Sequence, residues 1–205
     1  MTSPILGIPA VDPAFEAAVT AELEQVEERL TEAVKSDDAL LASAARHLVA
    51  AGGKRFRPLL ALTAGHFGDA DAPGVVDSAV VVELTHVATL YHDDVMDEAA
   101  LRRGAPSANA LWGNTVAILT GDFLFARASD IAADLGTESV RIQARTFERL
   151  VQGQLRETLG PRDSEDPVAH YLGVLSDKTA SLIATSARLG AMHAGVGADD
   201  VDHPD

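Results

Sequence analysis

The sequence predicts an all-α fold, a single bundle of about nine helices. Apolar residues recur at spacings of three and four along most of the chain, and no segment shows the alternating pattern of a β-strand. Glycine and proline separate the helical stretches from one another. The chain has 205 residues, of which 47% are hydrophobic and only 4% aromatic, so we expect one sizeable core built from Ala, Leu and Val.

The N-terminal half is predicted to begin with a flexible arm at residues 1–11, followed by a single helical domain over residues 12–205. Asp12 and Pro13 are a typical helix start, because the aspartate side chain caps free backbone amides and proline suits the first turn. Apolar spacing, a glycine pair and two prolines then place three further helices, at about 38–51, 58–68 and 73–97.

The C-terminal half is predicted to open with a loop over residues 99–106 and a short segment at 107–113. Gly160 and Pro161 interrupt the helical pattern, because proline removes a backbone donor and glycine is flexible. The remaining helices are expected at about 114–135, 138–159, 167–176 and 177–194.

The composition indicates a cytoplasmic enzyme that binds neither nucleic acid nor membrane. Sixteen Lys and Arg against 31 Asp and Glu give a net charge of −15, which would repel nucleic-acid phosphates. The absence of cysteine excludes disulfides and thiolate metal sites. No apolar run approaches the roughly 18 residues of a membrane span, and no basic region precedes an apolar signal segment.

The most informative pattern is acidic and occupies residues 91–104, YHDDVMDEAALRRG. A helix turns by about 100° per residue, so Asp93 and Asp97 lie on one face, with Asp94 between them in sequence. Carboxylates without histidine or cysteine favour hard divalent cations, above all Mg²⁺. The alternative is a solvated acidic helix end, but like charges one turn apart destabilise a helix unless a cation neutralises them. The pattern therefore predicts a Mg²⁺ site.

Basic residues near this motif predict a diphosphate site. Arg102 and Arg103 follow the aspartates and offer forked donors to phosphate oxygens. Residues 52–58, GGKRFRP, add Lys54 and Arg57 after two glycines that allow a close backbone approach. The alternative is an ordinary helix–loop–helix joint, but clustered cations are conspicuous in so acidic a chain.

With both motifs, the sequence resembles the trans-isoprenyl diphosphate synthases, the polyprenyl synthetase family, and within it the long-chain, quinone-side-chain branch. The family's Gly-Gly-Lys-x-x-Arg-Pro element matches residues 52–58, and its first aspartate-rich motif matches residues 93–104. Further matches are at 83–90, 121–124, 153–154 and 178–180. The resemblance implies an isoprenoid-synthase-type bundle with a central active-site cavity. It also implies a Mg²⁺-dependent prenyltransferase that condenses isopentenyl diphosphate with an allylic diphosphate, usually as a homodimer.

The resemblance also implies roles for individual residues. Asp93 and Asp97 would hold the metal with help from Asp94, and the catalytic group would comprise Asp93, Asp97, Lys178 and Arg102. Isopentenyl diphosphate would be bound by Lys54, Arg57, His86 and Arg103. The allylic diphosphate would be bound by Arg102, Lys178 and Thr179.

Two neighbouring positions on the aspartate helix are given less obvious roles. His86 lies seven residues before Asp93 and eleven before Asp97, so the three side chains point within roughly 40° of one another, into one cleft. A lone histidine on an apolar helix is usually a core residue, and only the resemblance makes it a ligand. Small side chains at Ala88 and Thr89 would leave a tunnel open for products longer than geranylgeranyl.

Two other residues are not given a ligand role. Arg55 matches no critical position and is expected to be solvated, and His92 is expected to pack structurally.

The family's second aspartate-rich motif has no match, because residues 199–203, DDVDH, end in histidine and follow a turn-like stretch. The chain is therefore expected to be the N-terminal two-thirds of a synthase, C-terminally incomplete and inactive alone. The alternatives are a non-catalytic partner subunit of a heteromeric synthase, or a terpene cyclase. A cyclase would not need the second diphosphate site.

Overall fold

The computed structural model of the chain describes residues 12–197. The expected N-terminal arm and the acidic stretch at 199–203 lie outside these residues. In N-terminal to C-terminal order, the α-helices of the described part are α1 (Pro13–Ala33), α2 (Ala39–Ala50), α3 (Phe56–Gly65), α4 (Pro73–Met96), α5 (Ala108–Leu135), α6 (Thr137–Leu159), α7 (Pro167–Leu175) and α8 (Ser181–His193). These eight helices confirm the all-α prediction.

Two shorter elements complete the described part. A π-helical segment, η2 (Ser176–Ala180), joins α7 to α8. Two short strands, β1 (Leu101–Arg102) and β2 (Ala105–Pro106), form an antiparallel hairpin. The sequence had predicted only a loop here. Arg103 and Gly104 connect the strands with φ angles of 53° and 78°, and positive φ at both central residues suits a tight hairpin turn.

Several helix starts follow from the capping residues. The side chains of Asp12, Asp38 and Asp166 each accept hydrogen bonds from backbone amides in the first turn of the helix that follows. Gly113, with a φ of 81°, breaks the helical path inside α5, where the sequence had separated a short segment from the long helix. The predicted boundaries are therefore close to those of the structure.

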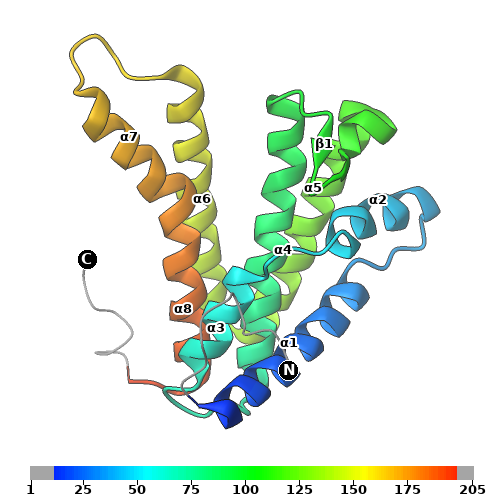
Figure 1. Cartoon of the computed structure of the whole chain (residues 1–205), viewed down its shortest axis with the longest axis vertical. Helices are drawn as coiled ribbons and strands as arrows, with labels where there is room; N and C mark the ends of the chain where they lie inside the picture. The colour runs from blue at the N-terminus through cyan, green and yellow to red at the C-terminus, as the bar shows by residue number, and fades with distance from the viewer. Residues whose placement is uncertain (1–11, 198–205) are drawn as a thin grey trace.

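Helix α4 lies at the centre of the bundle and packs against α1, α3, α5 and α8 (Figure 1). Its interior residues are mainly Val, Leu and Ala, as the composition predicted. Helix α8 packs closely on α3, because Gly190 of α8 has no side chain. A Cβ at Gly190 would lie 1.9 Å from the carbonyl oxygen of Ala61 in α3. The lower ends of the helices thus form one packed base.

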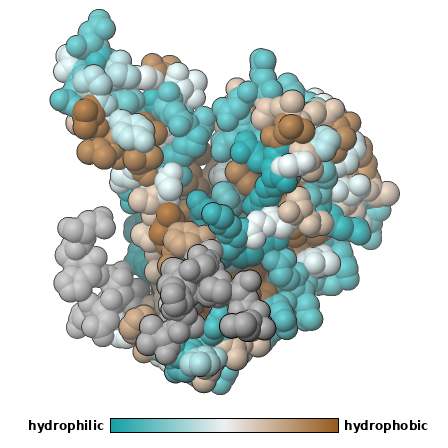
Figure 2. Space-filling view, viewed as in Figure 1, coloured by the Kyte–Doolittle hydropathy of each residue, from teal (hydrophilic) through white to brown (hydrophobic). Residues whose placement is uncertain are grey.

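Above this base the structure divides into two arms. One contains α4, α5 and the hairpin, and the other contains α6 and α7 (Figure 1). Figure 2 shows a notch between the arms, with hydrophobic residues on the α6–α7 arm. The exposed apolar side chains of this arm include Val151, Leu155, Leu159, Val168, Tyr171 and Leu172.

Helix α4 is also the described helix whose length and composition would allow it to cross a membrane. Of its most apolar window, 67% is buried inside the protein. It carries Glu83, His86 and Asp93. These features are those of a central helix in a bundle.

Candidate active site

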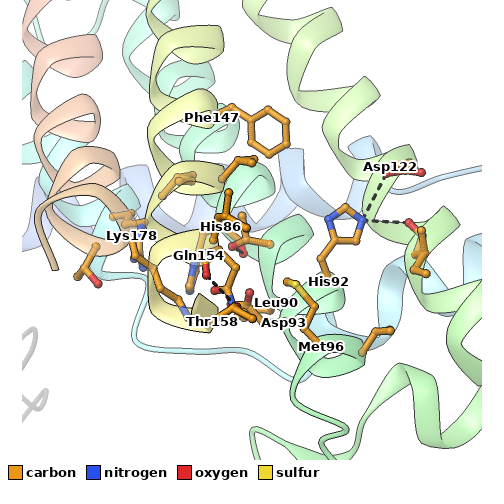
Figure 3. A pocket seen from close by; sticks show the side chains of 18 residues that line it. His86, Leu90, His92, Asp93, Met96, Asp122, Phe147, Gln154, Thr158 and Lys178 are labelled. Atoms are coloured by element: carbon orange, nitrogen blue, oxygen red, sulfur yellow. Dashed lines mark hydrogen bonds and ion pairs between the residues drawn. The ribbon is translucent and has the colours of Figure 1, made fainter. Parts of the chain in front are cut away.

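A cavity of about 670 Å³ lies between the two arms. Helices α4 and α5, with Arg57 of α3, supply one wall, and α6 with η2 supplies the other. Figure 3 shows Lys178 on one side and His92 with Asp122 on the other, with His86 and Gln154 between them. Six of the residues predicted from the sequence line this cavity: Arg57, His86, Thr89, Asp93, Lys178 and Thr179.

The acidic motif divides between the cavity and the protein interior. Asp93 lines the cavity, whereas Asp94 is fully buried and accepts a hydrogen bond from Arg102 Nε at 2.6 Å. Asp94 therefore does not line the cavity, and its expected role in helping Asp93 and Asp97 to hold the metal stays a prediction. Successive helix residues diverge by about 100°, so Asp93 and Asp94 cannot share a face. Arg102 does not line the cavity either, and its expected contact with the allylic diphosphate stays a prediction.

Asp93 lines the cavity, whereas Asp97, one helical turn further on, is exposed and does not line it. Together the two carboxylates would suit a divalent cation that is shared with a ligand. Burial raises the pKa of Asp93, and the nearby charge of Asp97 raises it further, while Lys178 and Arg102 oppose the shift. A divalent cation would relieve this cost. In the part of the chain that the structure describes, no group of three His, Asp or Glu residues could hold a metal alone. Two carboxylates suit Mg²⁺, which usually completes its octahedron with water and substrate phosphates.

Arg57 brings a buried positive charge to the cavity wall. Its Nε is buried without a hydrogen-bond partner. Burial lowers the pKa of Arg57, and Arg103 lowers it further, while the carboxylate of Glu83 opposes the shift. A buried polar group without a partner is costly, so this guanidinium is suited to an anionic ligand entering the cavity.

His86 lies on the same wall and is neutral at physiological pH. Burial and the charges of Arg57, Arg103, Arg55 and Arg102 lower its pKa to about 3. A neutral imidazole can still donate one hydrogen bond to a phosphate oxygen. The predicted convergence of His86 and Asp93 on one cavity is confirmed.

The other predicted cations lie behind the cavity wall or outside it. Arg103 donates to the carbonyl oxygens of Leu48, at 2.9 Å, and Gly52. Lys54 is exposed, and neither it nor Arg103 lines the cavity. The expectation that Arg55 would be solvated was wrong, because it is only 8% exposed and is paired with acidic residues.

Lys178 reaches the cavity from the π-helical segment η2. A π-helical turn inserts one residue into a helix, and such insertions are frequent at functional sites. Gly153 of α6 permits the close packing, because a Cβ there would lie 2.6 Å from the backbone nitrogen of Lys178. The ammonium group pairs with Glu157, also on α6.

The apolar part of the cavity differs from the expected tunnel wall. Thr89 lines the cavity, but Ala88 is fully buried in the hydrophobic core and does not. The expected position of Ala88 on this wall was therefore wrong. Sequence reasoning also missed Phe147, whose ring lies 4.1 Å from that of Phe125. The amphipathic pattern of α6 could have suggested this inward position.

His92 and Gln154 were quoted from the sequence without a ligand role, and both line the cavity. His92 Nε2 lies 3.1 Å from the carbonyl oxygen of Ile118 and 3.3 Å from a carboxylate oxygen of Asp122, which ties α4 to α5. Gln154 Oε1 is buried without a hydrogen-bond partner. Helical periodicity places such residues on a face but does not reveal what the opposite helix offers.

Comparison with known proteins identifies the family of the chain. A model of the family described as polyprenyl synthetase matches residues 38–204. The chain belongs to the polyprenyl synthetase family. A nonaprenyl diphosphate synthase from Mycobacterium tuberculosis is 48% identical over 199 residues. A dimethylallyltranstransferase from the same species is 40% identical over 198 residues.

A solved family member shows the same fold. The geranylgeranyl pyrophosphate synthase from Corynebacterium glutamicum, complexed with calcium and isoprenyl diphosphate, matches with a TM-score of 0.85 and 49% identity. It covers 95% of this chain, and the two relatives from M. tuberculosis cover 97% and 95%. The chain itself spans only 59%, 61% and 60% of the nonaprenyl synthase, the transferase and the solved synthase.

Proposed function

We propose that this chain carries the main diphosphate-binding part of a prenyltransferase that condenses isopentenyl diphosphate with an allylic diphosphate to form a long-chain polyprenyl diphosphate. The observation that carries the proposal is the buried, unpartnered Nε of Arg57, which lies on one cavity wall with His86 and Asp93. Cationic and acidic groups there meet an apolar wall, which suits a substrate with a charged head and a hydrocarbon tail.

The names of the relatives support this reaction over the alternatives. Each of the three is a prenyl diphosphate synthase or a transferase, and none is a terpene cyclase. The name of the nonaprenyl diphosphate synthase supports a long-chain product for this protein. The calcium and isoprenyl diphosphate in the solved relative support a divalent metal and a diphosphate ligand. We infer that the metal in this protein is Mg²⁺, and that the protein acts in the cytoplasm as a homodimer.

The reaction breaks the carbon–oxygen bond of the allylic diphosphate, and the electron pair leaves with the diphosphate. The double bond of isopentenyl diphosphate then attacks the allylic carbon, and loss of a proton to the released diphosphate restores a double bond. Mg²⁺ on Asp93 and Asp97 would stabilise the charge of the leaving group. Lys178 adds a fixed cation on the opposite wall.

The remaining residues position the second substrate. Arg57 and His86 would hold the diphosphate of isopentenyl diphosphate, and Lys54 would approach it from the exposed loop. Apolar side chains along the wall would exclude water from the allylic cation and guide the growing chain, so positioning supplies much of the rate enhancement.

A condensation assay tests the proposal. The 205-residue chain is joined to the C-terminal part of the M. tuberculosis nonaprenyl relative and supplied with radiolabelled isopentenyl diphosphate, geranyl diphosphate and Mg²⁺. We expect elongated products from this chimera, negligible product from the 205-residue chain alone, and loss of activity in chimeras carrying Asp93→Ala or Arg57→Met. Normal turnover by the Arg57→Met chimera would contradict the assignment.

A further inference from the structure

Arg55 occupies an unusual place at the start of α3. Its backbone is left-handed, with φ 45° and ψ 36°, a conformation that is uncommon outside glycine. Its side chain is buried and donates to four acceptors in three other segments of the chain. These acceptors are the two carboxylate oxygens of Glu27, at 2.5 and 3.0 Å, Glu83 Oε1, at 2.7 Å, and the carbonyl oxygen of Val49, at 2.9 Å.

This set of hydrogen bonds ties three helices to one loop. Glu27 belongs to α1, Val49 to α2 and Glu83 to α4, while Arg55 itself ends the loop that leads into α3. The same loop is held from its other side, because Arg103 donates to the carbonyl oxygen of Gly52. The loop is therefore anchored at Gly52 by Arg103 and at its end by the side chain of Arg55.

Glu83 links this clamp to the charges of the cavity. It is only 2% exposed and lies 2.7 Å from Arg55 and 3.8 Å from Arg103. Its charge also acts on Arg57, whose pKa it raises against the effect of burial. One buried carboxylate thus faces three guanidinium groups, and only the group of Arg57 lines the cavity.

We propose that Arg55 is a positioning residue for isopentenyl diphosphate, acting through the loop at residues 52–55 and through Glu83. It does not line the cavity, but it fixes the loop that carries Lys54 and the start of the helix that carries Arg57. Preorganised cations bind an anion more tightly than mobile ones, because less ordering is needed on binding. This inference rests on the proposed function of the same cavity.

Titration calorimetry of the 205-residue chain tests this role. It measures the affinity for isopentenyl diphosphate and for inorganic diphosphate, which is a simpler probe. Arg55→Met removes the clamp but leaves Glu83 buried without its main partner, which can prevent folding. The double variant Arg55→Met with Glu83→Gln removes both charges and is expected to fold. Arg55→Lys keeps the charge but cannot bridge both carboxylates at once.

We expect the double variant to bind both probes at least tenfold more weakly than the wild-type chain, with an unchanged circular dichroism spectrum. Arg55→Lys should recover part of this loss. The matched control is Arg141→Met, which removes an exposed arginine paired with Glu138 on α6, and its affinity should stay within twofold of wild type.

Wild-type affinity in the folded double variant would overturn the role of Arg55. If the double variant does not fold, the affinity of Arg55→Lys is used instead. Wild-type affinity in Arg55→Lys would then overturn the role of Arg55. Arg57→Met separates this result from the proposed function. If the wild-type chain binds neither probe, or if Arg57→Met binds as well as wild type, the diphosphate site itself is wrong.

Discussion

Arg102 donates from Nε to Asp94 Oδ1 at 2.6 Å, and this pair holds the second aspartate of the acidic motif away from the cavity that Asp93 lines. The hairpin formed by β1 and β2 brings Arg102 back against the end of α4. Two adjacent carboxylates thus acquire different roles: one is available to a cation, and the other anchors the hairpin.

We predict that Asp94→Ala lowers the free energy of unfolding by about 1–3 kcal/mol, because it removes the buried partner of Arg102. A value near the lower end is expected, since Arg102 is 29% exposed and Asp94 Oδ2 already lacks a partner. Asp93→Ala should change stability little but abolish any effect of Mg²⁺ on diphosphate affinity. Urea denaturation and calorimetry measure the two effects, and equal stabilities would contradict the division of roles.

We predict that His86 makes stability depend on pH between about 3 and 6.5. Its pKa is about 3 in the folded chain, below the ordinary value of 6.5, so the unfolded chain binds more protons in this window. Its contribution is present above pH 6.5 and is lost as the pH falls, by at most about 1.4 kcal/mol per pH unit. The variant His86→Gln should lack this pH-dependent contribution to the free energy of unfolding.

The pH test compares urea denaturation of the wild-type chain and His86→Gln at several pH values. The difference between the two proteins isolates the histidine, because buried carboxylates with raised pKa values, such as Asp93 and Asp94, contribute to both proteins with the opposite sign. Parallel stability curves from pH 7 to pH 4 would show that His86 is not held neutral.

We predict that Gly153→Val displaces Lys178 from the cavity. A Cβ at Gly153 would lie 2.6 Å from the backbone nitrogen of Lys178, and a branched side chain would force α6 and η2 apart. In the chimera, activity should fall at least tenfold. Gly173→Val is the matched control, because a Cβ there meets only the end of Arg156, at 3.7 Å. Equal activity in the two variants would argue against the packing role of Gly153.

We predict that Thr89→Phe shortens the products of the chimera, because Thr89 lines the cavity. Ala88→Phe should instead overpack the core and lower the free energy of unfolding by about 1–3 kcal/mol. Chromatography of dephosphorylated products and urea denaturation measure these effects. An unchanged product distribution for Thr89→Phe would mean that the growing chain follows another wall.

The sequence by itself determined the helical fold and six of the residues that line the cavity. Apolar spacing and capping residues are local signals, so the starts of α1 and α4 could be predicted without tertiary information. The face shared by His86 and Asp93 follows from helix geometry alone, and the family motifs identified Arg57 and Lys178.

Only the tertiary structure decided which cations and carboxylates neutralise one another. Arg55 and Glu83 are separated by 28 residues, and Arg102 meets Asp94 only because the hairpin folds back against α4. A buried charge is costly unless it is paired, so each of these groups needs a counterion. Sequence spacing cannot reveal that counterion, because it can come from any helix that packs nearby. The same packing placed Ala88 in the core and left Arg57 facing the cavity.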